Sequence, residues 1–171
     1  SAFVHPKYHR PPKPNHNDLI VLVLEKKTTV KPRRVASSAL IDKAKEGRAV
    51  GFGNVDRNGM FGYGVKRQVD VPIASAACAG KIGGRTDASF YGCAKLMEIV
   101  AGKQLLARDS CTGDSGGPFY IAGPRNTWLL AGATSRASDD AISNCGDGGI
   151  YVRVDKYREW IEDVSKVKLP K

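Results

Sequence analysis

The chain has 171 residues, of which 42% are hydrophobic, so it is long enough to bury one complete hydrophobic core. Its longest clean apolar run, Leu19–Leu24, is far too short for a membrane-spanning helix. The net charge of +10 would suit nucleic acid, acidic polysaccharide or anionic lipid, but no basic stretch is interleaved with stacking aromatics, which argues against a nucleic-acid platform.

The basic residues are densest in the first 34 positions, where we expect a solvated surface that could also hold polyanions. In this region "HPKYHRPPKPNH" (5–16) is predicted to be a surface loop, because its clustered prolines prevent a regular helix. The apolar run Leu19–Leu24 is predicted to be a buried strand. The stretch 29–47 is basic and poor in apolar residues, so it is predicted to be a connector.

Short apolar runs then recur between glycine-rich and polar turns, a pattern typical of an all-β sandwich or barrel. The glycine-rich segment 51–64 has neither GxGxxG nor P-loop spacing, so it is predicted to be a mobile hairpin or loop rather than a phosphate cradle. A short helix is predicted near Ile73–Ala79. The predicted strands after position 48 are Ala49–Phe52, Val65–Ile73, Trp128–Thr134 and Ile150–Val154.

The segment "DKYREWIEDVSKV" (155–167) is predicted to be a C-terminal helix, with Asp155 as its N-cap. Its apolar residues recur every three or four positions, which is the spacing of one helix face. They are Tyr157, Trp160, Ile161 and Val164.

The four cysteines allow three pairings if all of them are bridged. Because no CxxC occurs, a zinc site is not expected, and no metal or other cofactor is predicted. An even number of widely spaced cysteines favours two disulfides and an oxidising compartment. The chain begins at Ser1 without an initiator Met or a leader, so we expect that a targeting segment was removed and that the protein is secreted, or periplasmic.

"DSCTGDSGGPFY" (109–120) places Ser115 among glycines and acids, as an exposed nucleophile would be placed. The glycines let the backbone turn sharply, so that the N–H groups of Gly113 and Ser115 could converge on one oxygen as an oxyanion hole. A serine hydroxyl needs a base to become nucleophilic. The three histidines are His5, His9 and His16, all within the first sixteen residues.

"CTGDSGGP" closely resembles the nucleophile motif of the trypsin-like serine proteases, which have the chymotrypsin fold. "FVHPKYHRPPKPNHNDLIVLVLE" resembles the family segment in which His-Pro-x-Tyr precedes Asn-Asp-Ile/Leu and an apolar strand, and "GFG" resembles the Gly-Trp-Gly that opens the second barrel. "WLLAGATS" and "CGDGGIYVRVDKYREWI" resemble the closing strands and the terminal helix. These matches follow the family order across nearly the whole chain.

The resemblance implies an all-β fold, a double six-stranded β-barrel with a C-terminal α-helix. This chain would supply the end of the first barrel and all of the second. The implied segments are the last strands of the N-terminal barrel (1–32), an inter-barrel connector (33–46), the C-terminal barrel with the nucleophile and the S1 pocket (47–154), and the C-terminal helix and tail (155–171).

The resemblance also implies the roles of individual residues. Ser115 would be the nucleophile, Asp18 the acid that orients the catalytic imidazole, and Gly113 with Ser115 the oxyanion hole. Asp114 would pair with an α-amino group released by zymogen cleavage.

The same resemblance implies an S1 pocket, the cavity that holds the substrate side chain before the scissile bond. Asp109 would lie at its base and select Arg or Lys, because a desolvated carboxylate requires a cation. Cys111 would pair with Cys145 across this pocket. Val100 stands where many family members carry a cysteine, so the partner of Cys78 would shift to Cys93. The other residues of the pocket would be Ser110, Ser135, Ala137 and Gly149.

The chain departs from the family pattern in further places, and its loop from Ala137 to Cys145 is longer than usual. It has no segment that resembles the family's Ala-Ala-His-Cys, so we expect the catalytic histidine and the amino terminus that pairs with Asp114 on a separate N-terminal chain of a nicked or two-chain enzyme. "TSRA" (134–137) replaces the usual Ser-Trp-Gly, and Arg136 could favour acidic neighbours in a substrate or pair with Asp139 or Asp140.

The function implied is a secreted endopeptidase that cleaves after Arg or Lys through an acyl-enzyme on Ser115. Its expected partners are the histidine-bearing N-terminal fragment, protein or peptide substrates, and protein inhibitors. The alternative is a catalytically silent binding protein of the same fold that holds polyanions on its basic surface. Retention of Ser115, Asp18, Asp114 and Asp109 favours the enzyme, since a binding protein does not need them.

Overall fold

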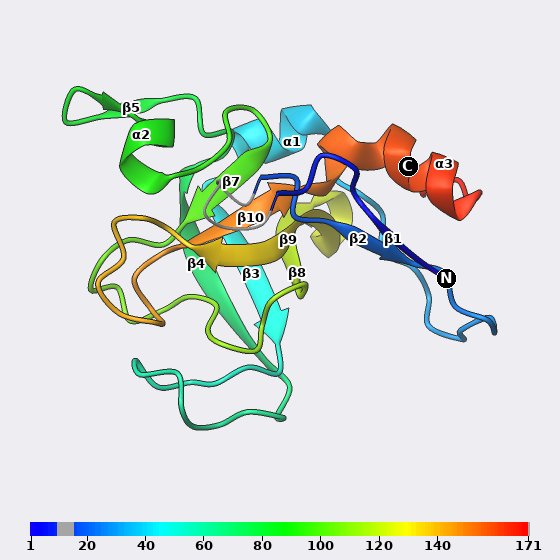
Figure 1. Cartoon of the computed structure of the whole chain (residues 1–171), viewed down its shortest axis with the longest axis horizontal. Helices are drawn as coiled ribbons and strands as arrows, with labels where there is room; N and C mark the ends of the chain where they lie inside the picture. Colours follow the sequence, from blue (N-terminus) through cyan, green and yellow to red (C-terminus); the bar gives the residue numbers. More distant parts are fainter. Residues whose placement is uncertain (10–15, 171) are drawn as a thin grey trace.

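A closed barrel of six antiparallel strands forms the centre of the molecule (Figure 1). The computed structural model describes residues 1–9 and 16–170, and within them the barrel strands follow the order β10-β7-β4-β3-β8-β9. Closure leaves no free sheet edge and confirms the all-β class that was predicted. The barrel strands are β3 (Glu46–Gly51), β4 (Arg67–Ser75), β7 (Glu98–Ala101), β8 (Pro118–Gly123), β9 (Thr127–Ala137) and β10 (Gly149–Arg153).

Helices and short strand pairs surround the barrel, and the C-terminal helix packs beside β1 and β2 (Figure 1). No helix in the described residues is long and apolar enough to cross a bilayer. These outer elements are β1 (Ala2–Val4), β2 (Ile20–Leu22), α1 (Ser38–Lys43), β5 (Lys81–Ile82), β6 (Arg85–Thr86), α2 (Asp87–Tyr91), the 3-10 turns η1 (Pro124–Asn126) and η2 (Val154–Tyr157), and α3 (Arg158–Ser165).

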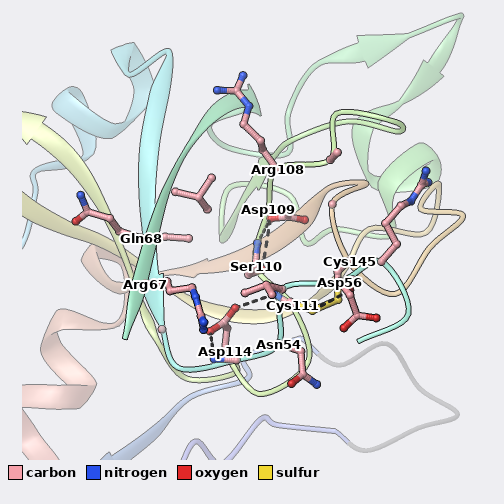
Figure 2. A pocket seen from close by; sticks show the side chains of 18 of the residues that line it. Asn54, Asp56, Arg67, Gln68, Arg108, Asp109, Ser110, Cys111, Asp114 and Cys145 are labelled. Carbon is pink, nitrogen blue, oxygen red and sulfur yellow. Dashed lines mark hydrogen bonds between the residues drawn. A yellow bond between two sulfur atoms is a disulfide. The ribbon is translucent and has the colours of Figure 1, made fainter. Parts of the chain in front are cut away.

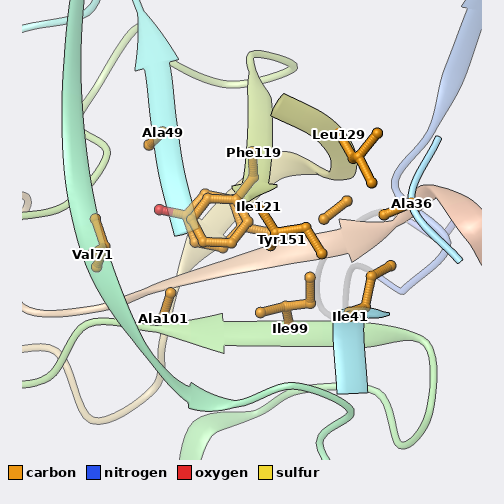
Figure 3. Close-up of a cluster of buried hydrophobic side chains, with 11 residues drawn as sticks. Ala36, Ile41, Ala49, Val71, Ile99, Ala101, Phe119, Ile121, Leu129 and Tyr151 are labelled. Carbon is orange, nitrogen blue, oxygen red and sulfur yellow. The ribbon is translucent and has the colours of Figure 1, made fainter. Parts of the chain in front are cut away.

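The interior of the barrel is filled by apolar side chains from the strands and from α1 (Figure 3). Phe119 is fully buried and stacks on Tyr151 with ring centroids 4.1 Å apart. The Phe119 ring also packs against Gly47, where a Cβ would lie 2.2 Å from it, so only glycine fits there. Burial of such side chains stabilises the barrel by about 1.5–3 kcal/mol each.

The strand predicted at Leu19–Leu24 forms, but the prediction that it is buried is wrong. β2 pairs only with β1, and Ile20 and Leu22 are 53% and 63% exposed. α3 contacts β2, but it leaves Val4, Ile20 and Leu22 exposed. The proline-rich residues 10–15 of the predicted loop lie outside the described part of the chain.

Two local predictions, a helix and an N-cap, are corrected by long-range contacts, and the predicted connector contains regular structure. The helix near Ile73–Ala79 is absent because β4 continues to Ser75, which pairs with Val100 of β7. The connector 29–47 contains α1 and the start of β3. Asp155 is not an N-cap: its carboxylate accepts from Arg153 and Ser38, and α3 begins three residues later.

Two disulfides close loops beside the barrel, and they are the pairs that the resemblance implies. Cys78–Cys93 lies in a second buried cluster around α2. Cys111–Cys145 joins the turn before β8 to the loop between β9 and β10. The glycine-rich segment 51–64 is a loop, as predicted, and its fold depends on Asp56, whose carboxylate accepts from three backbone N–H groups of residues 58, 60 and 61.

Candidate active site

Ser115 lies on a tight turn at the end of the connection 102–117 between β7 and β8. Gly113 and Gly116 have φ angles of 96° and 78°, values that favour glycine. Backbone bonds fix the turn to β9, since Gly116 N–H donates to the carbonyl of Thr134 at 2.8 Å. The turn therefore presents Ser115 at an exposed position on a rigid barrel.

A cavity of about 230 Å³ opens beside Ser115. Three segments line it, the nucleophile turn (109–115), the end of β9 (134–137) and the loop before β10 (143–148). Four of the predicted S1 residues, Asp109, Ser110, Ser135 and Ala137, are in this lining. The fifth, Gly149, adjoins it, because a Cβ there would lie 3.0 Å from the Asp109 carboxylate.

Two acids, Asp109 and Asp147, line this cavity, and a small hydrogen-bond network holds Asp109. Its Oδ1 accepts from the Tyr151 hydroxyl at 2.7 Å and from Ser110 N–H at 2.7 Å. Burial raises the pKa of Asp109 to about 6, although these hydrogen bonds act in the opposite direction. A cation that enters the cavity would relieve this desolvation, so the carboxylate is prepared for a positively charged group.

Asp18 meets the cavity wall although it is far from it in sequence. The Ser135 hydroxyl donates to Asp18 Oδ2 at 2.7 Å, across 117 residues. Asn17 holds the segment in place, because its Oδ1 accepts from the Tyr157 hydroxyl at 2.9 Å. The structure thus brings the predicted catalytic acid to the strand that also borders Ser115.

The histidines make no hydrogen bond to Asp18 or Ser115 within the described residues. His5 packs edge-on against Tyr157 and Trp160, with ring centroids 5.1 Å and 4.7 Å apart. Burial, and then the charge of Lys7, lower the pKa of His5. His9 is exposed and His16 half-buried.

Asp114 lines a second cavity, of about 330 Å³, to which Asp109 and Ser110 also belong (Figure 2). Its two carboxylate oxygens accept from Gly53 N–H and Cys111 N–H, each at 2.8 Å. Within residues 1–9 and 16–170 no cation pairs with it. Asn54 also lines this cavity, and its buried Oδ1 has no hydrogen-bond partner in the described part of the chain. The amino group of Ser1 lies elsewhere and donates to Val23 O at 2.9 Å.

Several site residues could not be predicted from the sequence. Tyr63 lies against Gly113, where an added Cβ would be 2.8 Å from its ring, and no motif marks it. Arg57 connects the loop 51–64 to the cavity rim by a 2.7 Å hydrogen bond to Ser143. Tyr151 has an apolar neighbour on each side in the sequence, which predicts a core side chain rather than a hydrogen-bond donor to Asp109.

Arg136 has a different partner from those predicted. Its guanidinium pairs with Glu98 at 2.8 Å rather than with Asp139 or Asp140. Glu98 and Arg136 stand on β7 and β9, on either side of β10, so the barrel brings them together. The described residues contain no group of three or more side chains suited to a metal ion.

Comparison with known proteins gives consistent matches. The family model described as Trypsin matches residues 1–161. Transmembrane protease serine 11G of Mus musculus and of Rattus norvegicus are each 32% identical over 118 residues, which cover 68% of this chain and 26% of theirs. Transmembrane protease serine 11E of Mus musculus is 32% identical over 111 residues, 65% of this chain and 24% of its own. The chain therefore spans about a quarter of the length of these relatives.

Proposed function

The chain belongs to the trypsin family of serine proteases, and from that premise we propose that it is the serine-bearing part of an extracellular endopeptidase that cleaves after Arg or Lys. The observation that carries the proposal is one cavity that Ser115 and Asp109 both line and whose wall residue Ser135 is bonded to Asp18. The two disulfides and the matches to transmembrane proteases support an extracellular setting.

In the proposed mechanism, Ser115 Oγ attacks the scissile carbonyl while an imidazole takes its proton. Asp18 orients that imidazole and stabilises the imidazolium. The N–H groups of Gly113 and Ser115 bind the oxyanion, each donor contributing about 3 kcal/mol to transition-state stabilisation. Protonation of the leaving amine gives the acyl-enzyme, which water then hydrolyses.

Preference for Arg or Lys follows from the buried carboxylate of Asp109. A neutral side chain in the cavity would leave this charge desolvated and unpaired, at a cost of about 3–5 kcal/mol. Gly149 keeps the way to the carboxylate open, since a Cβ there would lie in tight contact with it.

We assign the imidazole and a new α-amino terminus to an N-terminal companion chain from the same precursor. The exposed apolar side chains of β1 and β2, which include Ile20 and Leu22, support a docked companion. An ammonium group fits the cavity lined by Asp114 and Asn54, because it could pair with the Asp114 carboxylate and donate a hydrogen bond to Asn54 Oδ1. Without the imidazole, this chain by itself is expected to be almost inactive, because removing one triad member can cost about 10⁶ in turnover.

The test combines intact mass, measured natively and after denaturation, with labelling by a fluorophosphonate probe. We expect a histidine-bearing companion and a label on Ser115, with Ser115→Ala as the unlabelled control. A sample that contains the companion and still ignores the probe would contradict the enzyme and favour the catalytically silent binding protein.

A further inference from the structure

Arg136 and Glu98 form an ion pair beside the site that the proposed mechanism does not use. The pair is bidentate, with Nη1 to Oε1 at 3.0 Å and Nη2 to Oε2 at 2.8 Å, and the side chains are only 19% and 1% exposed. The carbonyl of Gly92 accepts a further bond from Nη2 at 2.9 Å, and Ala94 N–H donates to Glu98 at 2.7 Å. Both charges are therefore held in one geometry.

Stability alone does not account for this pair. Removing two charges from water costs several kcal/mol, and apolar residues of similar size often replace such a pair without loss. The pair also occupies rigid positions, since β10 lies between the two strands that carry it. A costly and precisely held guanidinium next to a catalytic cavity requires another explanation.

The guanidinium contacts Ser135, the residue that bonds to Asp18. Arg136 Nη1 lies 3.3 Å from Ser135 Oγ, and Ser135 Oγ donates to Asp18 Oδ2 at 2.7 Å. A guanidinium can only donate hydrogen bonds. Ser135 Oγ must therefore accept from Arg136, and its own hydrogen is directed toward Asp18.

We infer that Arg136 is a positioning residue for Asp18 and acts through the Ser135 hydroxyl, with Glu98 holding the guanidinium in place. The inference rests on the proposed function, in which Asp18 orients the imidazole. A fixed Ser135 hydroxyl keeps the Asp18 carboxylate in one orientation, so the imidazole is aligned before the substrate arrives. Arg136 does not contact the reacting atoms in this scheme.

The experiment measures Ser115 phosphonylation by a small neutral fluorophosphonate, across pH, in the full-length activated enzyme. E98L/R136M removes both charges together, so no unpaired charge stays buried. We expect phosphonylation about tenfold slower, the effect of one lost hydrogen bond from a charged donor. With an arginine amide substrate, kcat should fall by a larger factor than KM changes. R136K keeps a cation that can pair with Glu98 but loses the bidentate guanidinium. It should give a smaller loss of rate at an unchanged melting temperature.

Ser135→Ala decides whether Arg136 acts through Ser135. In that background, E98L/R136M should cause no further loss of rate, because the relay is already broken. An equally large loss in both backgrounds, or wild-type rates in both E98L/R136M and R136K, would overturn the inference. A wild-type enzyme that resists the probe would instead overturn the proposed function, and with it the need to position Asp18.

Discussion

Replacing Asp109 by Asn should remove both the affinity for cations at the cavity and its dependence on pH. With a pKa of about 6, the carboxylate is about 9% ionised at pH 5 and about 99% ionised at pH 8. A ligand cation binds the ionised form, so wild-type affinity for benzamidine should weaken about tenfold as the pH falls from 8 to 5. At pH 8, Asp109→Asn should weaken binding by about 10²- to 10⁴-fold, since the ligand's buried charge loses its partner.

Calorimetric titration of the full-length enzyme with benzamidine at several pH values measures both effects. The matched control is Asp163→Asn, because Asp163 is an exposed acid on α3 with a side chain 75% exposed. It should keep the wild-type affinity and the wild-type pH dependence. Wild-type binding that is constant between pH 5 and pH 8, or a pH dependence that survives in Asp109→Asn, would refute the assignment of Asp109 to cation binding.

Three further predictions concern stability and surface charge. Phe119→Ala should lower the free energy of unfolding by about 3–5 kcal/mol in urea titrations, whereas Leu105→Ala, at an exposed position, should change it by less than about 0.5 kcal/mol. Opening Cys78–Cys93 by a double change to Ser should cost about 3 kcal/mol, because the bridge closes a 15-residue loop; an unchanged melting temperature would contradict this. If the basic residues of the first 34 positions form a patch that binds polyanions, a heparin column should retain the protein, and elution at the salt of a neutral control would argue against it.

The features predicted from sequence were those carried by short stretches of chain. The turn around Ser115 needs glycines with positive φ, and their spacing is visible in the motif itself. The strands β3, β4, β9 and β10 were predicted within a few residues because apolar runs between turns are a local signal.

What tertiary structure alone decided were the partners of those stretches. The bond between Ser135 and Asp18 spans 117 residues, and the one between Arg136 and Glu98 spans 38, so each depends on how the strands close into a barrel. Nearby acids suggested Asp139 or Asp140 for Arg136, yet β10 brings Glu98 within reach instead. β2 shows the same limit: an apolar run predicts a strand, but only the neighbours present in space determine whether its side chains are buried.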